Sequence, residues 1–165
     1  MSTPTIPPIE GPASLRFPGP RLYNGRQSID LCMLVTVLGR EAGNQPRAAI
    51  EAVGCSIRNR VKAALARWGR DWEEVIEKRW QYSSMNGPAN DPNLLKYPNL
   101  KYDPWPLCLE VAETVYSGDL ADPTGGAHSY FDKSLDADPP QWSIDGEYVK
   151  TYDVGAFHFF RLSTL

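Results

Sequence analysis

The sequence predicts an α+β protein that is mainly helical and carries a small antiparallel β-sheet near its C-terminus. Apolar residues recur at helical spacing between residues 28 and 78 and again between 104 and 118. Short runs rich in aromatic and β-branched residues, which are typical of strands, come only after residue 126. Helices and strands that are segregated along the chain in this way indicate the α+β class.

The 165 residues are enough for one domain with a hydrophobic core. Residues 1–27 are rich in proline and glycine and show no periodicity, so we expect an extended arm there and the domain over residues 28–165. A net charge of −3 argues against nucleic acid as a partner. No segment approaches the ~20 apolar residues that span a membrane, and the start lacks the pattern of a secretory signal. We therefore expect synthesis in the cytoplasm.

The first helix is expected to begin at Ser28, a plausible N-cap, and to end near Gly43 and Asn44. Its sequence, SIDLCMLVTVLGREAG, is apolar almost all round, which is typical of a buried helix. The chain has three cysteines, an odd number, so they cannot all pair internally. All three lie in apolar helical patterns and are expected to be buried free thiols, at positions Cys32, Cys55 and Cys108.

The second helix is expected to start around Pro46, which suits a first helical turn, and to run to about Trp68. Its apolar residues are spaced by three and four, so one face should be buried. The other face is charged and is expected to be solvated; it carries Arg47, Glu51, Arg58, Arg60 and Lys62.

The remaining elements follow from shorter patterns. Asp71 and Glu74 resemble a capping box for a short helix that ends near Lys78. Residues 79–103 are irregular and rich in Asn, Pro and Tyr, and a loop of that length is usually functional or disordered. A helix follows from Pro104 to Gly118, and strands are expected in AHSYF and in YVKTYDVGAFHFFRL.

Glu41 is the first candidate for chemistry. A glutamate in the last turn of a helix is usually a surface residue, but the helix before it is apolar and its C-terminal end is electrostatically negative. Both effects favour the protonated carboxyl that a general acid needs near neutral pH.

Two further stretches suit a sugar ligand. In QYSSMNG, an amide (Gln81), a ring (Tyr82) and a hydroxyl (Ser83) match the groups of an acetamido sugar. DPTGGAHSYF brings a hydroxyl, two glycines that permit close backbone approach, and two side chains expected on one strand face. These residues are Thr124, Gly125, Gly126, His128 and Tyr130. His158, in AFHFFR, is as consistent with a core histidine as with a functional one.

These motifs together resemble the spore-cortex-lytic family of cell wall hydrolases, the SleB/CwlJ type. Glu41-Ala42 and Pro46 match a GEARGEP-like motif, and Asn59-Arg60-Val61 follows eighteen residues after Glu41, as in that family. QYS at 81–83 is similar to its QFSW-like motif. DPTGGA with a following aromatic, and His158-Phe159-Phe160, resemble the later motifs in the same order over residues 30–162.

The departures from the family pattern also inform the assignment. Gly43 stands where the motif usually has Arg, and Gln45 replaces its second Glu, which leaves Glu41 as the essential acid. Ser84 and Met85 replace the usual Trp, so a subsite there should differ. No wall-binding module is present, which favours a phage lysin, a tail-associated lysin or an injected effector, with a phage or secretion partner for delivery.

The resemblance implies a lysozyme-like domain that cuts peptidoglycan between N-acetylmuramic acid and N-acetylglucosamine, as a lytic transglycosylase without metal or cofactor. It implies Glu41 as acid and base, and a groove lined near Glu41 by Gln81, Tyr82 and Ser83. Ser83 is a candidate partner of Glu41 or of the acetamido group. Thr124, Gly125, Gly126 and Tyr130 would form the opposite wall. His128 and His158 would also bind substrate, with His158 as the weakest assignment.

Four alternatives stay open from the residues. Hydrolysis in the same site would make the protein a muramidase. A zinc peptidase or amidase would use His128 and His158 with Asp122 or Asp153, although the chain has no H-x-x-x-H pattern. A non-catalytic glycan-binding phage component would leave Glu41 incidental, and a Cys/His peptidase would need an exposed reactive cysteine.

Overall fold

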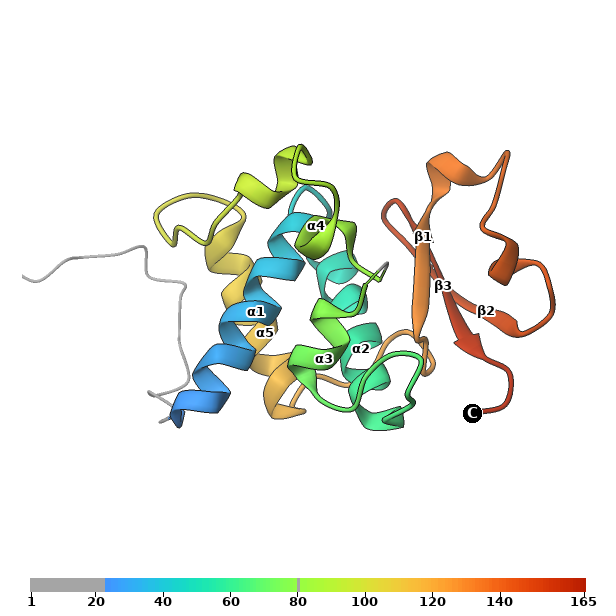
Figure 1. The fold of residues 1–165 in the computed structure, drawn as a ribbon, viewed down its shortest axis with the longest axis horizontal. Helices are drawn as coiled ribbons and strands as arrows, with labels where there is room; N and C mark the ends of the chain where they lie inside the picture. The colour runs from blue at the N-terminus through green and yellow to red at the C-terminus, as the bar shows by residue number, and fades with distance from the viewer. Residues whose placement is uncertain (1–22, 80) are drawn as a thin grey trace, which may run out of the picture.

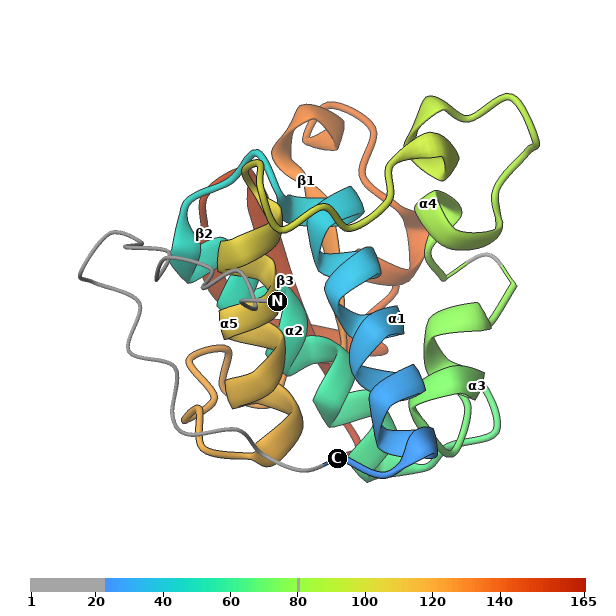
Figure 2. The same cartoon turned by 90° about the vertical axis from the view of Figure 1, so that its left-hand side faces the viewer.

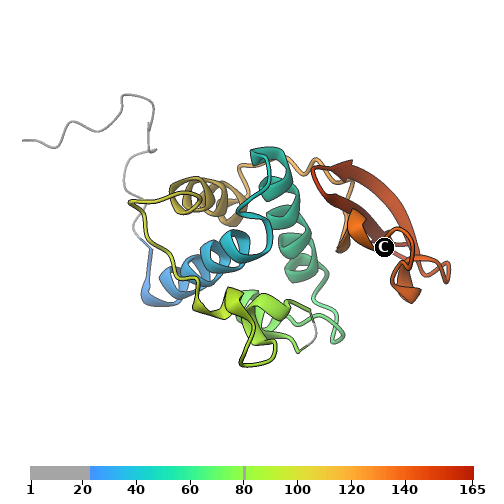
Figure 3. The same ribbon diagram turned by 90° about the horizontal axis from the view of Figure 1, so that it is seen from above.

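The computed structural model describes residues 23–79 and 81–165. A group of helices forms the larger part, and a three-stranded sheet stands at one side of it, beside α2 and α4 (Figure 1). The view from above shows the same separation, with the sheet next to α2 (Figure 3). The predicted α+β class and the small C-terminal antiparallel sheet are confirmed.

Helix α1 (Gly25–Ala42) begins three residues before the predicted start. Asn24, not Ser28, is its N-cap: the Asn24 side chain accepts a hydrogen bond from the backbone N–H of Gln27, whose side chain accepts from the N–H of Asn24. Residues 34–39 are all buried, as predicted for an apolar helix. Cys32, in contrast, is exposed, while Cys55 and Cys108 are buried free thiols as expected.

Helix α2 (Arg47–Ala63) ends five residues before the predicted Trp68. Ala64 takes a left-handed conformation with φ of 50°, and its N–H bonds the carbonyl oxygen of Arg60, which closes the helix. The predicted apolar face is buried against α1 and α5, but the opposite face is not all solvated. Arg58 and Arg60 are buried because long-range polar partners meet their guanidinium groups.

The remaining helices are short, apart from α5 (Trp105–Ser117), which ends at Gly118 as predicted. Asp71 caps α3 by accepting the N–H of Glu74. The short elements are α3 (Trp72–Glu77), α4 (Ser83–Asn86) and the 3-10 helices η1 (Pro92–Leu95), η2 (Lys133–Leu135) and η3 (Gln141–Ser143). Helices α4 and η1 thus divide the segment that the sequence predicted as one irregular loop.

The sheet consists of β1 (Ser129–Asp132), β2 (Tyr148–Val154) and β3 (Phe157–Leu162), in the antiparallel order β1-β3-β2. Tyr130 pairs with Phe159, and Phe131 pairs with His158. Directly paired residues share a face of a sheet, and successive residues alternate between faces. Tyr130 and His158 therefore lie on opposite faces. Phe157 and Phe159 join the core cluster of α1, α2 and α5, so the face of Tyr130 is the one toward the helices.

Among the described residues, no helix has the length and apolar character required to cross a membrane.

Candidate active site

Glu41 lies in the last turn of α1, where α1, α4 and β1 converge. The hydroxyl of Ser84 donates a hydrogen bond to Oε1 of Glu41, and the hydroxyl of Tyr130 donates to Oε2 at 3.0 Å. The Glu41 side chain is half-buried. Three segments far apart in the sequence thus fix one carboxyl group, which is how a reactive acid would be held.

Arg40, the residue before Glu41, holds Ser84 in position. The Arg40 guanidinium donates to the carbonyl oxygen of Ser84 at 2.8 Å, and also to those of Lys96 at 2.8 Å and Leu94 at 3.0 Å. Arg40 therefore ties α4 and the loop after it to the end of α1, and so orients the hydroxyl on Glu41.

The sequence pointed to the neighbouring serine instead. Ser83 is exposed and is the first residue of the single turn α4, whereas Ser84 is buried. Successive side chains on a helix diverge by about 100° because a turn has ~3.6 residues. One position along α4 is therefore enough to exchange the partner of Glu41, and the expectation for Ser83 as that partner was wrong.

Tyr130, which the sequence placed in the wall opposite Glu41, bonds Glu41 directly. Its ring packs against Phe157 and Phe159. Burial and the negative charge of Glu41 raise the pKa of Tyr130 well above its ordinary value. The hydroxyl therefore keeps its proton and remains available to Glu41 as a donor.

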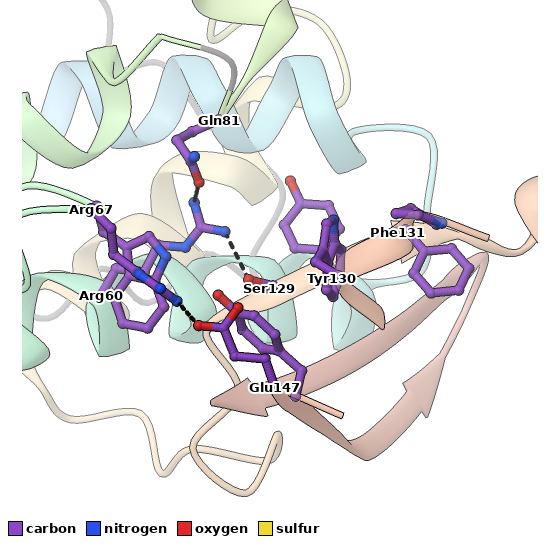
Figure 4. A pocket seen from close by; sticks show the side chains of 11 residues that line it. Arg60, Arg67, Gln81, Ser129, Tyr130, Phe131 and Glu147 are labelled. Carbon is purple, nitrogen blue, oxygen red and sulfur yellow. Dashed lines mark hydrogen bonds and ion pairs between the residues drawn. The ribbon is translucent and has the colours of Figure 1, made fainter. Parts of the chain in front are cut away.

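Two cavities lie near the bonded pair of Glu41 and Tyr130. One, of about 270 Å³, is lined by Glu41 itself, by Asn44, Asn93 and Lys96, and by a second carboxylate, Asp132. The other, of about 440 Å³, is lined by Tyr130 and by aromatic and polar side chains that include Trp68, Gln81, Ser129 and Trp142 (Figure 4). Tyr130 lines the larger cavity and bonds Glu41, which lines the smaller one.

Arg60 is the main site residue that the sequence did not reveal. Buried on α2, it donates to Oε1 of Gln81 at 2.6 Å, to the hydroxyl of Tyr82 at 3.2 Å and to Oγ of Ser129 at 3.3 Å. It also donates to the carbonyl oxygen of His128. Figure 4 shows its guanidinium between Gln81 and Ser129. Only the position of Asn59-Arg60-Val61 in the family register hinted at this role.

Gln81 and Tyr82 lie in different environments, one at a cavity and the other in the core. Gln81 lines the larger cavity, whose lining does not include Glu41. Tyr82 is almost fully buried in the core cluster, so its ring offers no open face to a sugar. The expected role of Tyr82 in the groove wall is therefore not supported: its ring belongs to the core, and its hydroxyl is engaged by Arg60.

The DPTGGA segment, residues 122–127, forms a hydrogen-bonded turn that is attached to α2 and does not reach Glu41. Asp122 accepts hydrogen bonds from the hydroxyl of Thr124, the N–H of Gly126 and the side chain of Asn59. Although burial opposes the charged form, the bonds from Thr124 and Asn59 lower the pKa of Asp122. Thr124 is fully buried, and Gly125 and Gly126 have φ of 67° and 85°, which favours glycine. Their expected place in the wall opposite Glu41 is not supported.

Neither histidine contacts Glu41. His128 stacks on Trp68, with ring centroids 4.6 Å apart, and burial together with the charges of Arg60 and Arg161 lowers its pKa to about 4. His158 lies on the far face of the sheet, where its ring nitrogens meet Asp153 and, at 2.9 Å, Asp136. Within residues 23–79 and 81–165, no group of three or more His, Cys, Asp or Glu side chains is arranged to hold a metal ion.

Comparison with known proteins now defines the family. The model of the family described as Cell Wall Hydrolase matches residues 44–160, well over half of the chain. This chain belongs to the cell wall hydrolase family. The predicted family and enzyme class are confirmed. The match begins just after Glu41, so the assignment of Glu41 rests on the geometry described above.

Two solved structures share the fold of this cell wall hydrolase. One is the catalytic domain of the germination-specific lytic transglycosylase SleB from Bacillus anthracis, with 22% identity and a TM-score of 0.63, covering 85% of this chain and 100% of that one. The other is the catalytic domain of the Bacillus cereus SleB protein, with 20% identity and a TM-score of 0.62, covering 86% and 94%. The predicted lysozyme-like fold is thus confirmed. A search of curated proteins gave no match.

Proposed function

We propose that this cell wall hydrolase cuts peptidoglycan strands between N-acetylmuramic acid and N-acetylglucosamine as a lytic transglycosylase, with Glu41 as its acid and base. The observation that carries the proposal is the position of Glu41: it lines a cavity and receives a hydroxyl on each carboxylate oxygen. The similar Bacillus anthracis protein is described as a lytic transglycosylase, which supports the reaction type.

The first step needs a protonated Glu41. Its proton passes to the glycosidic oxygen, the bond from that oxygen to C1 of the muramyl sugar breaks, and positive charge develops at C1. A hydroxyl can donate or accept a hydrogen bond. Ser84 and Tyr130 are therefore suited to hold Glu41 both as the acid and as the carboxylate left behind.

The second step returns the proton. The Glu41 carboxylate takes the proton of the C6 hydroxyl, and O6 attacks C1 of the same sugar. The products are a 1,6-anhydromuramyl end and a free hydroxyl on the other fragment, with Glu41 protonated again. No water is consumed, so one carboxyl group serves both steps.

Hydrolysis is the second candidate because Asp132 lines the same cavity as Glu41. Two carboxyl groups flanking the bond are the requirement of a hydrolytic glycosidase, in which the second acts as base or nucleophile. Asp132 is held by a hydrogen bond from the N–H of Ser134 to its Oδ1, at 2.8 Å. In a muramidase it would activate water or attack C1, and neither role exists in the transglycosylase.

Product analysis separates the two reactions. Peptidoglycan digested with the purified protein is examined by mass spectrometry, alongside the variant Asp132→Asn. The transglycosylase predicts anhydromuramyl ends from both proteins. Reducing muramyl ends from the wild type, lost in Asp132→Asn, would establish hydrolysis, and cleaved peptides would establish a peptidase.

Access to the wall is a further part of the proposal. The enzyme would be made in the cytoplasm and reach peptidoglycan through a phage or secretion partner, or on release. Fractionation of the producing cells before and after lysis, followed by immunoblotting, tests this. Wall-associated enzyme in intact cells without such a partner would contradict it.

A further inference from the structure

The segment between α4 and α5 exposes an unusual number of large apolar side chains. Within residues 88–104, Leu95 is 78% exposed, Tyr97 68%, Leu100 56% and Tyr102 66%. The segment passes over the C-terminal end of α1, close to the turn that carries Glu41 (Figure 2). Clustered exposed apolar groups on a soluble domain often mark a binding surface.

A third cavity lies under this segment. It measures about 460 Å³ and is lined by Leu95, Tyr97 and Trp105 together with the polar side chains of Asn44, Lys96 and Asp103. A volume of this order is typical of ligand sites.

This cavity borders the space beside Glu41. Asn44 and Lys96 line both of them, as do two glycines of the α1 terminus. A ligand that occupies one space and extends past Asn44 and Lys96 enters the other. The larger cavity shares no lining residue with these two, and Tyr130, which lines it, is bonded to Glu41.

The wall of the third cavity is held in place rather than loose. Arg40 donates to the carbonyl oxygens of Leu94 and Lys96, and its guanidinium lies 5.4 Å from the centre of the Tyr97 ring. The ring is therefore positioned before any ligand arrives, which lowers the entropic cost of binding.

We propose that this third cavity binds a sugar ring of the same glycan strand, beyond the bond that Glu41 cuts. The inference rests on the proposed function and extends it to the length of strand recognised. The Tyr97 ring offers a flat apolar face to a pyranose, while Asn44, Lys96 and Asp103 offer donors and acceptors to its hydroxyl and acetamido groups. A strand threaded through the Glu41 cavity necessarily presents its next sugars on either side.

The test compares two tyrosines of the same segment. Tyr97 lines the cavity, while Tyr102 is equally exposed but is absent from its lining, so Tyr102→Ala is the matched control for Tyr97→Ala. Both variants act on peptide-free glycan strands of two lengths, tetrasaccharides and strands of about ten disaccharides. Loss of a stacked ring should lower kcat/KM for long strands by about tenfold, or about 1.4 kcal/mol, and for tetrasaccharides by much less. Tyr102→Ala should keep the wild-type ratio, and Tyr97→Phe should restore it.

Each outcome decides the inference. Equal losses on both lengths would mean that Tyr97 acts only through Arg40 on the Glu41 turn, and would overturn it. An effect seen only on strands that keep their stem peptides would assign the cavity to peptide and would also overturn it. Absence of anhydro products from the wild-type protein would instead refute the proposed function, so the two failures are distinguishable.

Discussion

The two oxygens of Glu41 are held by different residues, Ser84 from α4 and Tyr130 from β1. This arrangement suits a group that must give up a proton and recover it without losing its position. The half-buried setting of Glu41 leaves it open to the cavity on one side.

Ser84→Ala tests the identity of the hydroxyl partner. Removal of one hydrogen bond to Glu41 should lower the rate of glycan cleavage about tenfold, since such a bond is worth about 1.5 kcal/mol. Ser83→Ala, one position away and exposed, should lower it less. Cleavage rates of both variants on purified peptidoglycan test which serine bonds Glu41. A larger loss of rate in Ser83→Ala than in Ser84→Ala would favour Ser83.

His128 gives the fold a dependence on pH. Its pKa is lowered to about 4 in the folded protein from an ordinary value of 6.5, so the unfolded chain binds the extra proton between these two values. The contribution of neutral His128 to the free energy of unfolding should be full above pH 6.5. It should be lost as the pH falls toward 4, by up to about 3 kcal/mol. His128→Phe keeps a ring against Trp68 and should flatten the change between pH 7 and 5 in urea unfolding. An unaltered slope in that variant would contradict the account.

Glu41, Gln81 and Tyr130 could be singled out from the sequence because each belongs to a local pattern. Arg60 was not, since a charged residue at a helical spacing looks solvated until its distant partners are known. Those partners, Gln81, Ser129 and the carbonyl of His128, come from segments 21 residues or more away. A local pattern also cannot tell Ser83 from Ser84, because that choice depends on how the single turn of α4 is rotated.

At the scale of elements, α1 positions Glu41 through a close contact with α5. Gly39, one turn before Gly43, faces the ring of Trp105 so closely that a Cβ there would lie 2.1 Å from a ring atom. The long apolar pattern predicted the buried half of α1 correctly. The helix begins at Gly25, before the predicted Ser28, because Asn24 and Gln27 form a capping box.

Gly39→Ala should therefore disturb the packing of α1 on α5. Overpacking of this kind costs about 2 kcal/mol, which for a chain of this size is about 4–8 °C in Tm. Gly25→Ala, in the same helix, is the control: its Cβ would meet nothing within 4 Å, and Tm should hold or rise slightly. Thermal unfolding followed by circular dichroism measures both, and equal Tm values would refute the contact.

At the scale of the whole molecule, α2 connects the helical part to the sheet. Asn59 anchors the Asp122 turn that leads into β1, and Arg60 anchors the start of β1 and Gln81. The eighteen-residue interval between Glu41 and Asn59 thus separates the proposed acid from the residue that holds the turn before β1. The fold class was predictable from the order of helices and strands, whereas this connection depends on contacts between distant segments.

Arg60→Met should destabilise the molecule strongly. It leaves several buried polar groups without a partner, at about 3 kcal/mol or more in total. Arg67→Met removes an exposed ion pair with Glu147 that also spans the two parts, and should cost less than about 1 kcal/mol. Urea unfolding of both variants tests the difference, and comparable losses would show that Arg60 is not the main connection.

The most direct test of the central claim is the yield of 1,6-anhydromuramyl ends from peptidoglycan by the wild type and by Glu41→Gln. The variant keeps the size of the side chain and should fold with a wild-type circular dichroism spectrum, because a glutamine oxygen still accepts from Ser84 or Tyr130. The wild type should release anhydro ends and the folded variant none above background. Anhydro ends from Glu41→Gln at the wild-type rate would show that another group supplies the proton.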